Sequence, residues 1–134
     1  MNPARRVLSV FIASFIMLAG TAAGMAAERK PFTASSFAAA QAAGQPILID
    51  ISASWCPTCK AQKPIIDALA KQRETDRLVI FDVDFDSQKP VVRDFRAQSQ
   101  STLIAFNGKT ETGRSVGDTN PHSIARLVKS ALPK

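Results

Sequence analysis

The sequence predicts one α/β domain, and three observations along its 134 residues support that prediction. Residues 47–52 are nearly continuous in apolar side chains, as expected of a central strand that is covered on both faces. Residues 78–86 read as a second strand, and each of these strands is followed by a segment with helical spacing, the alternation typical of α/β folds. Strands at 102–106 and 111–116 flank Asn107-Gly108, which is a hairpin turn signal.

Four helices are predicted around these strands. The first, at 33–43, is rich in alanine, a strong helix former. The second, at 57–73, contains Pro64, which should kink it. A short third helix covers 90–97, and the last begins at Pro121. In this last helix apolar residues recur at positions i, i+3, i+4 and i+7, so one of its sides is expected to face the core.

The only two cysteines of the chain lie at the junction between the first strand and the helix that follows it, within Trp55-Cys56-Pro57-Thr58-Cys59-Lys60. With Cys56 at the N-cap and Pro57 at the first helical position, the backbone N–H groups of Thr58 and Cys59 point at the Cys56 sulfur. A thiolate there is stabilised by those donors and by the positive end of the helix dipole. Cys56 is therefore the predicted nucleophile of a redox site.

Cys59, one turn farther along the helix and more covered, is the predicted resolving cysteine. Its thiolate would attack the mixed disulfide that Cys56 forms with a substrate and so release the reduced product. Lys60 adds a positive charge nearby.

Three other uses of the cysteines stay open at this point. A structural disulfide across two intervening residues would remove little entropy from the unfolded chain. A zinc or copper site is the second alternative, but one cysteine pair and a single histidine do not complete a four-ligand site without carboxylates or a second subunit. A cysteine hydrolase that pairs Cys56 with His122 would leave Cys59 without a role.

Three acidic residues in the second strand, Asp82, Asp84 and Asp86, invite a calcium interpretation. A calcium-binding loop of the EF-hand type would need a glycine where Ser87 stands and a glutamate where Arg93 stands. We therefore interpret the three acids as the exposed face and the end of a strand.

The N-terminus has the layout of a secretory signal peptide. Arg5 and Arg6 precede an apolar run, and small residues follow it up to position 27. The apolar run is short for a membrane span. We expect a signal peptide at residues 1–27, cleaved between 23 and 27, and a mature domain at 28–134 that is periplasmic or otherwise exported. An uncleaved signal would leave the same domain tethered to the membrane.

The mature part has the size of one small domain. Its net charge falls from +6 to +4, because Arg5 and Arg6 are removed and no acid is. The remaining basic residues are scattered and tyrosine is absent, so the sequence argues against nucleic-acid binding.

The order of elements and the cysteine motif resemble the thioredoxin family over nearly all of the mature chain. The motif matches the family's active site except at Pro57-Thr58, where Gly-Pro is usual. Asp50 matches the family's buried aspartate, which is thought to assist proton transfer to and from the second cysteine. Pro64 matches its helix-kinking proline, and Gly117 its glycine after the final strand. The resemblance implies a thioredoxin-like α/β fold with a central mixed sheet of about four strands and helices on both faces.

Two positions depart from the family pattern. Ser101 takes the place of the family's cis-proline, and a non-proline peptide bond strongly prefers trans. In the family this loop helps to hold the substrate, so the change affects the expected substrate geometry and redox potential, and it leaves the sulfurs less shielded from metals. Asp82 stands where thioredoxin has the lysine paired with its buried aspartate. Two buried carboxylates close together raise the pKa of one of them.

The resemblance implies an exported thiol–disulfide oxidoreductase, and more specifically a reductase of protein disulfides. In it Cys56 attacks, Cys59 resolves and Asp50 carries the proton. The residues implied in substrate contact are Trp55, Pro57, Thr58, Ser101 and Thr102.

No organic cofactor and no metal are implied, and we expect a monomer. The implied partners are protein thiols and disulfides, a membrane electron-transfer protein that supplies electrons, and apocytochrome c as one client. A thiol oxidase, a copper-delivery module that uses the two cysteines, and an interaction module with vestigial chemistry remain alternatives.

Overall fold

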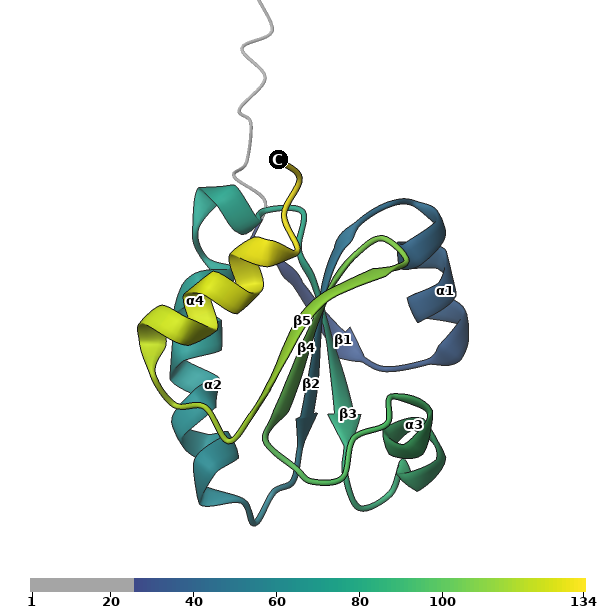
Figure 1. Cartoon of the computed structure of the whole chain (residues 1–134), viewed down its shortest axis with the longest axis vertical. Coiled ribbons are helices and arrows are strands. Elements are labelled where there is room, and N and C mark those ends of the chain that lie inside the picture. The colour runs from purple at the N-terminus through teal and green to yellow at the C-terminus, as the bar shows by residue number, and fades with distance from the viewer. Residues whose placement is uncertain (1–25) are drawn as a thin grey trace, which may run out of the picture.

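The central sheet has five strands in the order β1-β3-β2-β4-β5, one more than predicted. The computed structural model describes residues 26–134, so the signal-peptide prediction falls almost entirely outside the described residues (Figure 1). Strands β1, β2 and β3 run parallel, whereas β4 is antiparallel to β2 and to β5, which confirms a mixed sheet. The strands are β1 (Glu28–Pro31), β2 (Pro46–Ser52), β3 (Val79–Asp84), β4 (Thr102–Asn107) and β5 (Thr110–Val116).

Strand β1 is the strand that the sequence prediction missed. It is four residues long and reads Glu-Arg-Lys-Pro, a composition without strand character. It forms because the edge of β3 supplies backbone partners: Glu28 N–H donates to the Leu78 carbonyl, and Phe32 N–H donates to the Asp82 carbonyl. Pro31 is tolerated because β1 is an edge strand.

The four predicted helices are present with shifted ends. Thr33 and Asn120 cap the first and last of them through their side-chain oxygens. The second helix continues through Pro64 but ends at Ala70, after which the chain forms a 3-10 turn. The helices are α1 (Ala34–Ala42), α2 (Pro57–Ala70), α3 (Lys89–Asp94) and α4 (Pro121–Ser130), and the 3-10 turn η1 is Arg73–Thr75.

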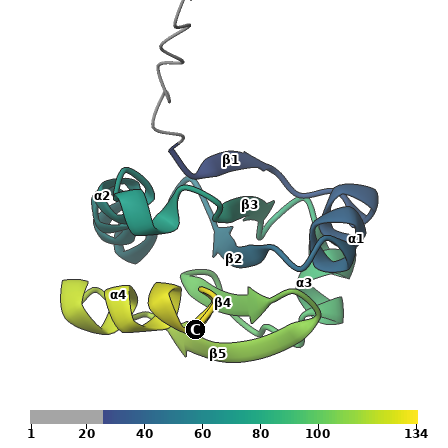
Figure 2. The ribbon, with the colours of Figure 1, turned by 90° about the horizontal axis from the view of Figure 1, so that it is seen from above.

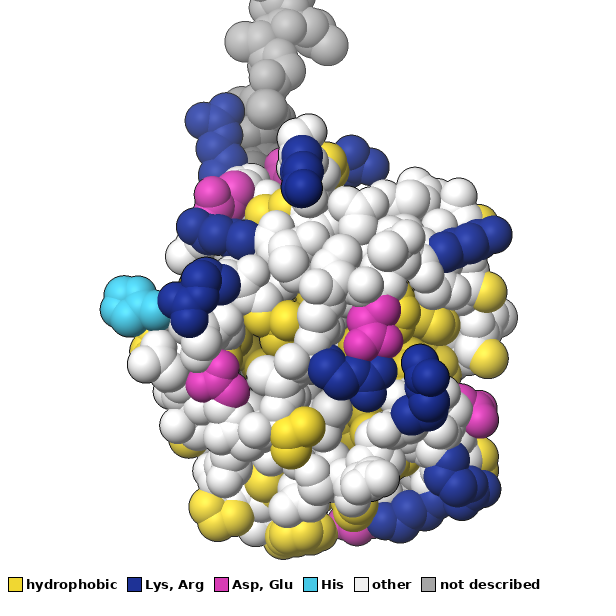
Figure 3. Space-filling view, in the orientation of Figure 1, with side chains coloured by type: hydrophobic (Ala, Val, Ile, Leu, Met, Phe, Trp, Pro, Cys, Tyr) yellow, Lys and Arg dark blue, Asp and Glu magenta, His cyan; other side chains and the backbone are white. Residues whose placement is uncertain are grey.

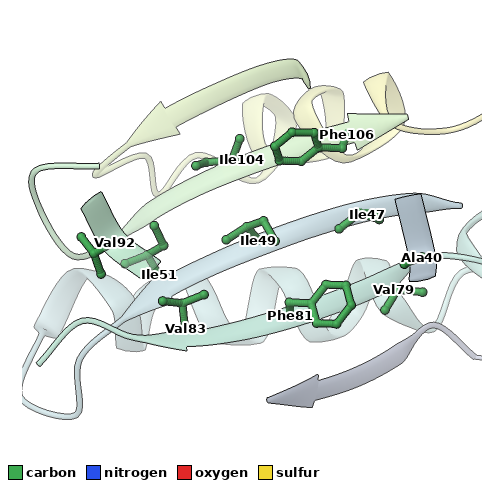
Figure 4. Close-up of a cluster of buried hydrophobic side chains, with 10 residues drawn as sticks. All are labelled: Ala40, Ile47, Ile49, Ile51, Val79, Phe81, Val83, Val92, Ile104 and Phe106. Carbon is green, nitrogen blue, oxygen red and sulfur yellow. The ribbon is translucent and has the colours of Figure 1, made fainter. Parts of the chain in front are cut away.

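Helices cover both faces of the sheet, as predicted. Seen from above, α2 and α4 lie on one side of the strands, and α1 and α3 lie on the other (Figure 2). Alternate strand residues point to opposite faces. The set toward α1 and α3 is drawn in Figure 4 and comprises Ala40, Ile47, Ile49, Ile51, Val79, Phe81, Val83, Val92, Ile104 and Phe106. The set toward α2 and α4 comprises Leu48, Ile66, Leu69, Leu78, Ile80, Leu103, Ile124 and Val128.

This alternation determines on which face of the sheet the acidic residues of the central strands lie. Leu48 and Ile80 face α2 and α4, so Asp50 and Asp82, two positions later in each strand, face the same way. The register of β2 and β3 pairs Asp50 directly with Asp82. Two carboxylates therefore lie side by side under the helix that carries the cysteines.

One end of the sheet gathers the segments that matter for the site. Ser52 at the end of β2 pairs with Asp84 of β3, and Thr102 at the start of β4 pairs with Val116 of β5. The β2–α2 loop closes this end, at the bottom of Figure 1, whereas the C-terminus lies at the opposite end. Ligand sites of open α/β sheets form at the carboxyl ends of parallel strands. Within residues 26–134, no helix has the length and apolar character needed to cross a membrane.

Candidate active site

Cys56 is the N-cap residue of α2 and Pro57 occupies the first turn, as predicted. The Cys59 backbone N–H donates a hydrogen bond to the Cys56 Sγ at 3.1 Å. The two sulfurs form a disulfide, with Cα atoms 5.3 Å apart. The oxidised pair is therefore held at the positive end of a fourteen-residue helix, where a negative charge on Cys56 is stabilised.

The two cysteines are both buried, but not in the order expected. Cys56 is 1% exposed and Cys59 is 8% exposed, so the prediction that Cys59 is more covered was wrong for the oxidised protein. Phe85, which follows β3, and Ala53 pack against the pair. A cleft of about 200 Å³ opens beside Cys59, which accounts for its greater exposure. Exposure therefore does not distinguish the nucleophile here.

Trp55, the residue before Cys56, is largely exposed to solvent. Its side chain is 54% exposed, and its Nε1–H donates to a carboxylate oxygen of Asp86 at 2.7 Å. In the space-filling view, exposed hydrophobic side chains gather at the end of the molecule where the β2–α2 loop lies (Figure 3). Pro57 is also exposed, and Thr58 is half-buried. These three residues form an accessible rim next to the cysteines.

The other two predicted substrate residues lie just before β4 and at its start, and they are less accessible than the rim. Ser101 and Thr102 are buried, and their hydroxyls donate to the carbonyls of Gln100 at 2.6 Å and Ser99 at 2.8 Å. Their side chains are thus used within the loop itself. A contact of Ser101 or Thr102 with a substrate would therefore come from the backbone of these two residues.

Ser101 has a backbone φ of +58°, in the left-handed region that disfavours residues with a Cβ. Residues 26–134 contain no cis peptide bond, which fits the preference expected for serine in place of proline. The position is fixed by neighbours: Gly117 N–H donates to the Ser101 carbonyl at 2.9 Å, and so does the side-chain amide of Gln62 at 3.3 Å. Sequence reasoning gave Gln62 no role, because a glutamine within an apolar helix pattern carries no signal of its partner.

Asp50 is buried, with 4% of its surface exposed, and it lies in the same cleft as Cys59. Its Oδ2 accepts a hydrogen bond from Arg29 Nη2 at 2.6 Å. Burial raises the pKa of Asp50, and the charge of Asp82 raises it further, whereas the charges of Arg29 and Lys63 lower it. The net direction is upward, so this carboxyl holds a proton more readily than an exposed aspartate.

Arg29 is a residue of this cleft that the sequence analysis did not find. The family lysine expected next to the buried aspartate is absent at Asp82, and the arginine of β1 supplies a cation from a different strand. Its Nη2 donates to Asp82 Oδ1 at 2.6 Å and its Nε to Asp82 Oδ2 at 3.0 Å. Arg29 was not predicted because strand β1 was not predicted. Without β1, nothing in the sequence indicates that residue 29 lies beside β3.

The acidic run after β3 forms a turn. The Asp84 Oδ1 accepts hydrogen bonds from the backbone N–H groups of Asp86 and Ser87 and from the Ser87 hydroxyl. These bonds lower the pKa of Asp84. The interpretation of the acids as the exposed end of a strand is confirmed for Asp84 and Asp86, which are exposed at and just beyond the end of β3. It was wrong for Asp82, which is half-buried and paired with Arg29. Across residues 26–134, no three His, Cys, Asp or Glu side chains are grouped as a metal site would require.

The cysteine-hydrolase alternative finds no support in this arrangement. His122 lies exposed in the first turn of α4, where its backbone N–H donates to the Asn120 side chain. The sulfur of Cys56 is bonded to Cys59 instead. The second cysteine, which a hydrolase leaves without a role, is thus part of the site.

Comparison with known proteins agrees with this geometry. The sequence model of the thioredoxin family, described as "Thioredoxin", matches residues 28–130. The thioredoxin of Mycobacterium tuberculosis (strain ATCC 25618 / H37Rv) is 32% identical over 89 residues, which cover 66% of this chain and 76% of that protein. The bifunctional thioredoxin reductase/thioredoxin of Mycobacterium leprae is 29% identical over 100 residues, and this chain spans only 22% of its length.

A solved structure extends the agreement to the fold. The crystal structure of Trxlp from Edwardsiella tarda EIB202 superposes with a TM-score of 0.74 at 38% sequence identity, covering 75% of this chain and 98% of that one. A matched family model, similar relatives and a Cys-x-x-Cys disulfide at the start of α2 agree with one another. The chain belongs to the thioredoxin family, and it is a thiol–disulfide oxidoreductase that acts on protein disulfides.

Proposed function

We propose that this protein is an exported reductase of protein disulfides, with Cys56 as the nucleophile and Cys59 as the resolving cysteine. The observation that carries the proposal is the hydrogen bond from the Cys59 N–H to the Cys56 Sγ at the start of α2. Together with the helix dipole, this donor stabilises negative charge on the Cys56 sulfur. A thiolate is the attacking species in disulfide exchange, so this environment supports Cys56 as the residue that attacks.

The reaction begins from the reduced dithiol. The Cys56 thiolate attacks one sulfur of a substrate disulfide; a Cys56–substrate bond forms, and the other substrate sulfur leaves as a thiolate that takes up a proton. Cys59 then loses its proton and attacks the Cys56 sulfur. The Cys56–Cys59 bond forms, the second substrate sulfur leaves and is protonated, and two electrons have passed to the substrate.

Asp50 is the group that we assign to the Cys59 proton. It lines the same cleft as Cys59, and its pKa is raised by burial, so it is suited to accept a proton from a thiol and to release it to solvent in the cleft. The rim formed by Trp55, Pro57 and Thr58 would contact the substrate on the side of Cys56.

The signal-peptide pattern of residues 1–27 supports export. In an oxidising compartment a reductase needs a source of electrons, and we propose a membrane electron-transfer protein that presents a dithiol. Oxidised apocytochrome c is one candidate client. Detection of the protein in the periplasmic fraction, shortened by its signal peptide, would support export, and retention of the full-length chain in the cytoplasm would overturn it.

The direction of electron flow is tested by the reduction potential of the purified protein. Equilibration against dithiothreitol or glutathione, read by Trp55 fluorescence, should give a value near the roughly −270 mV of thioredoxin, and the reduced protein should reduce insulin. A value near about −120 mV would make the protein a thiol oxidase instead. Stoichiometric copper(I) binding by the reduced protein, without insulin reduction, would favour a copper-delivery module. A Cys56→Ser variant is the control for each measurement.

A further inference from the structure

Arg29 joins three carboxylates that come from three different elements. From the edge strand β1, its Nη2 donates both to Asp50 Oδ2 on β2 and to Asp82 Oδ1 on β3, each at 2.6 Å. Its Nε donates to the second oxygen of Asp82 at 3.0 Å, and its Nη1 reaches Asp67 on α2 at 3.4 Å. Arg29 and Asp50 also line the cleft that opens at Cys59.

We propose that Arg29 is a positioning residue for the resolving step, holding the Asp50 carboxylate beside Cys59 in the form that accepts the Cys59 proton. The inference rests on the thiol–disulfide chemistry proposed above. In this step the Cys59 S–H bond breaks, its proton passes to an Asp50 oxygen directly or through solvent in the cleft, and the electron pair left on sulfur forms the bond to Cys56. Arg29 is not consumed and exchanges no proton.

The need for a cation follows from the burial of Asp50. A carboxylate that is only 4% exposed is costly to ionise unless it is paired. The strand register places Asp82 directly beside Asp50, so a second negative charge adds to the cost. The other charged groups near Asp50 are Lys63 of α2 and, on the cleft wall, Lys60.

The planar shape of its guanidinium explains why Arg29 is suited to hold the Asp50 carboxylate. A guanidinium presents several N–H donors in a planar fork, and three of its nitrogens are used here on three carboxylates. A lysine at position 29 would keep the charge but could not make this set of bonds. The two hydrogen bonds to Asp82 fix the plane of the guanidinium, and that plane fixes the direction from which Arg29 approaches Asp50.

Arg29 and Asp82 therefore act on Asp50 in opposite directions. The Arg29 charge and hydrogen bond lower the pKa of Asp50, whereas the Asp82 charge raises it. Removing the cation should make Asp50 hold its proton to higher pH, and neutralising Asp82 should let it ionise at lower pH. A residue that only stabilised the fold would leave the pH dependence of the resolving step unchanged when it is replaced.

The experiment compares Arg29→Met, Arg29→Lys and Asp82→Asn with the wild-type protein. The titration of the Asp50 carboxyl carbon is followed by ¹³C NMR in the reduced protein, and the single-turnover rate of dithiol oxidation by a small peptide disulfide is measured across pH. We expect Arg29→Met to move the titration to higher pH and to slow the reaction at neutral pH by roughly tenfold, a part of what general-base catalysis contributes. Arg29→Lys should lie between Arg29→Met and wild type, and Asp82→Asn should move the titration to lower pH. Arg93→Met, which removes an exposed arginine of α3, is the matched control.

Coincident Asp50 titrations and pH–rate profiles in wild type, Arg29→Met and Asp82→Asn would overturn the inference. If Arg29→Met does not fold, Arg29→Lys decides, and an Asp50 titration and a pH–rate profile that coincide with those of wild type overturn the inference. A wild-type protein that reduces no disulfide would instead overturn the proposed function, and the NMR titration would still report on Arg29 and Asp50. The two failures are thus distinguishable.

Discussion

Gln62 donates a hydrogen bond from its side-chain amide to the Ser101 carbonyl at 3.3 Å and a second one to the Asp118 carbonyl at 2.8 Å. Gln62 lies one turn after Cys59 on α2 and is only 1% exposed. Its two acceptors belong to the loop before β4 and the loop after β5, so one buried side chain ties both loops to the helix that carries the disulfide. Buried polar bonds of this kind specify one arrangement.

Replacing Gln62 by leucine should destabilise the protein. The substitution keeps most of the volume but removes the hydrogen bonds to the buried Ser101 carbonyl and to the partly buried Asp118 carbonyl, and we expect the free energy of unfolding to fall by about 1–3 kcal/mol. Urea denaturation of the oxidised protein measures this change. The control is Gln72→Leu, on an exposed position just beyond the end of α2. Equal stabilities for the two variants would show that the Gln62 bonds contribute nothing.

The backbone conformation of Ser101 can be tested with a pair of substitutions. Ser101→Ala and Ser101→Gly both remove the hydroxyl bond to Gln100, but only alanine keeps a Cβ at a φ of +58°. We expect the glycine variant to be more stable than the alanine variant by about 1 kcal/mol, the cost of a left-handed residue. Gly117→Ala, at a φ of +70° with open space around the added Cβ, should lose a similar amount. An alanine variant as stable as the glycine variant would contradict the left-handed conformation.

Most of the fold was predictable because its signals are local. The apolar run of β2, the glycine turn after Asn107 and the spacing in α4 each depend on neighbouring residues, and the structure confirms all three. The position of Cys56 at the N-cap was predictable for the same reason, since Pro57 marks the first helical turn.

The parts of the site that escaped prediction depend on pairing between distant residues. Strand β1 has no strand composition and exists only through its pairing with β3. Arg29 therefore could not be connected to Asp50 and Asp82 from sequence. The greater exposure of Cys59 than of Cys56 likewise depends on where Phe85 packs and where the cleft opens.

The roles of the two cysteines lead to different trapping behaviour. Cys59→Ser should accumulate a mixed disulfide between Cys56 and a substrate protein, because the resolving thiol is gone. Cys56→Ser should trap little, because Cys59 lacks the N-cap position that stabilises a thiolate. Non-reducing gels and mass spectrometry of each variant incubated with an oxidised substrate measure the yield. Stronger trapping by Cys56→Ser would reverse the assignment.

The bond between Trp55 and Asp86 should restrain an exposed side chain. Asp86→Ala removes the acceptor of the indole N–H, and we expect a loss of about 0.5–1.5 kcal/mol for that bond, which corresponds to roughly twofold to tenfold faster exchange of the Nε1 proton. Hydrogen exchange followed by NMR measures it. Asp94→Ala, an exposed acid of α3, is the control. Unchanged exchange in Asp86→Ala would mean that the bond does not persist in solution.

The raised pKa of Asp50 predicts how stability depends on pH. Burial, the largest cause, makes the folded protein hold this proton to higher pH than the unfolded chain does. Stability from Asp50 is therefore fully present below the ordinary pKa of aspartate, and it is lost as the pH rises through the raised value. Asp84 and Asp118 behave oppositely: their pKa values are lowered, chiefly by hydrogen bonds from Ser87 and Ser123, so their contribution is lost only in acid.

As the pH rises from the ordinary pKa of aspartate through the raised pKa of Asp50, the wild-type free energy of unfolding should consequently fall as Asp50 ionises, and that of Asp50→Asn should fall less over this range. Urea denaturation of both proteins at a series of pH values in this range measures the two slopes. Asp94→Asn, at an exposed position, should keep the wild-type slope. Parallel curves for wild type and Asp50→Asn would show that Asp50 does not titrate differently in the folded and unfolded states. The proton assigned to the resolving step would then have to be carried by another group in the cleft.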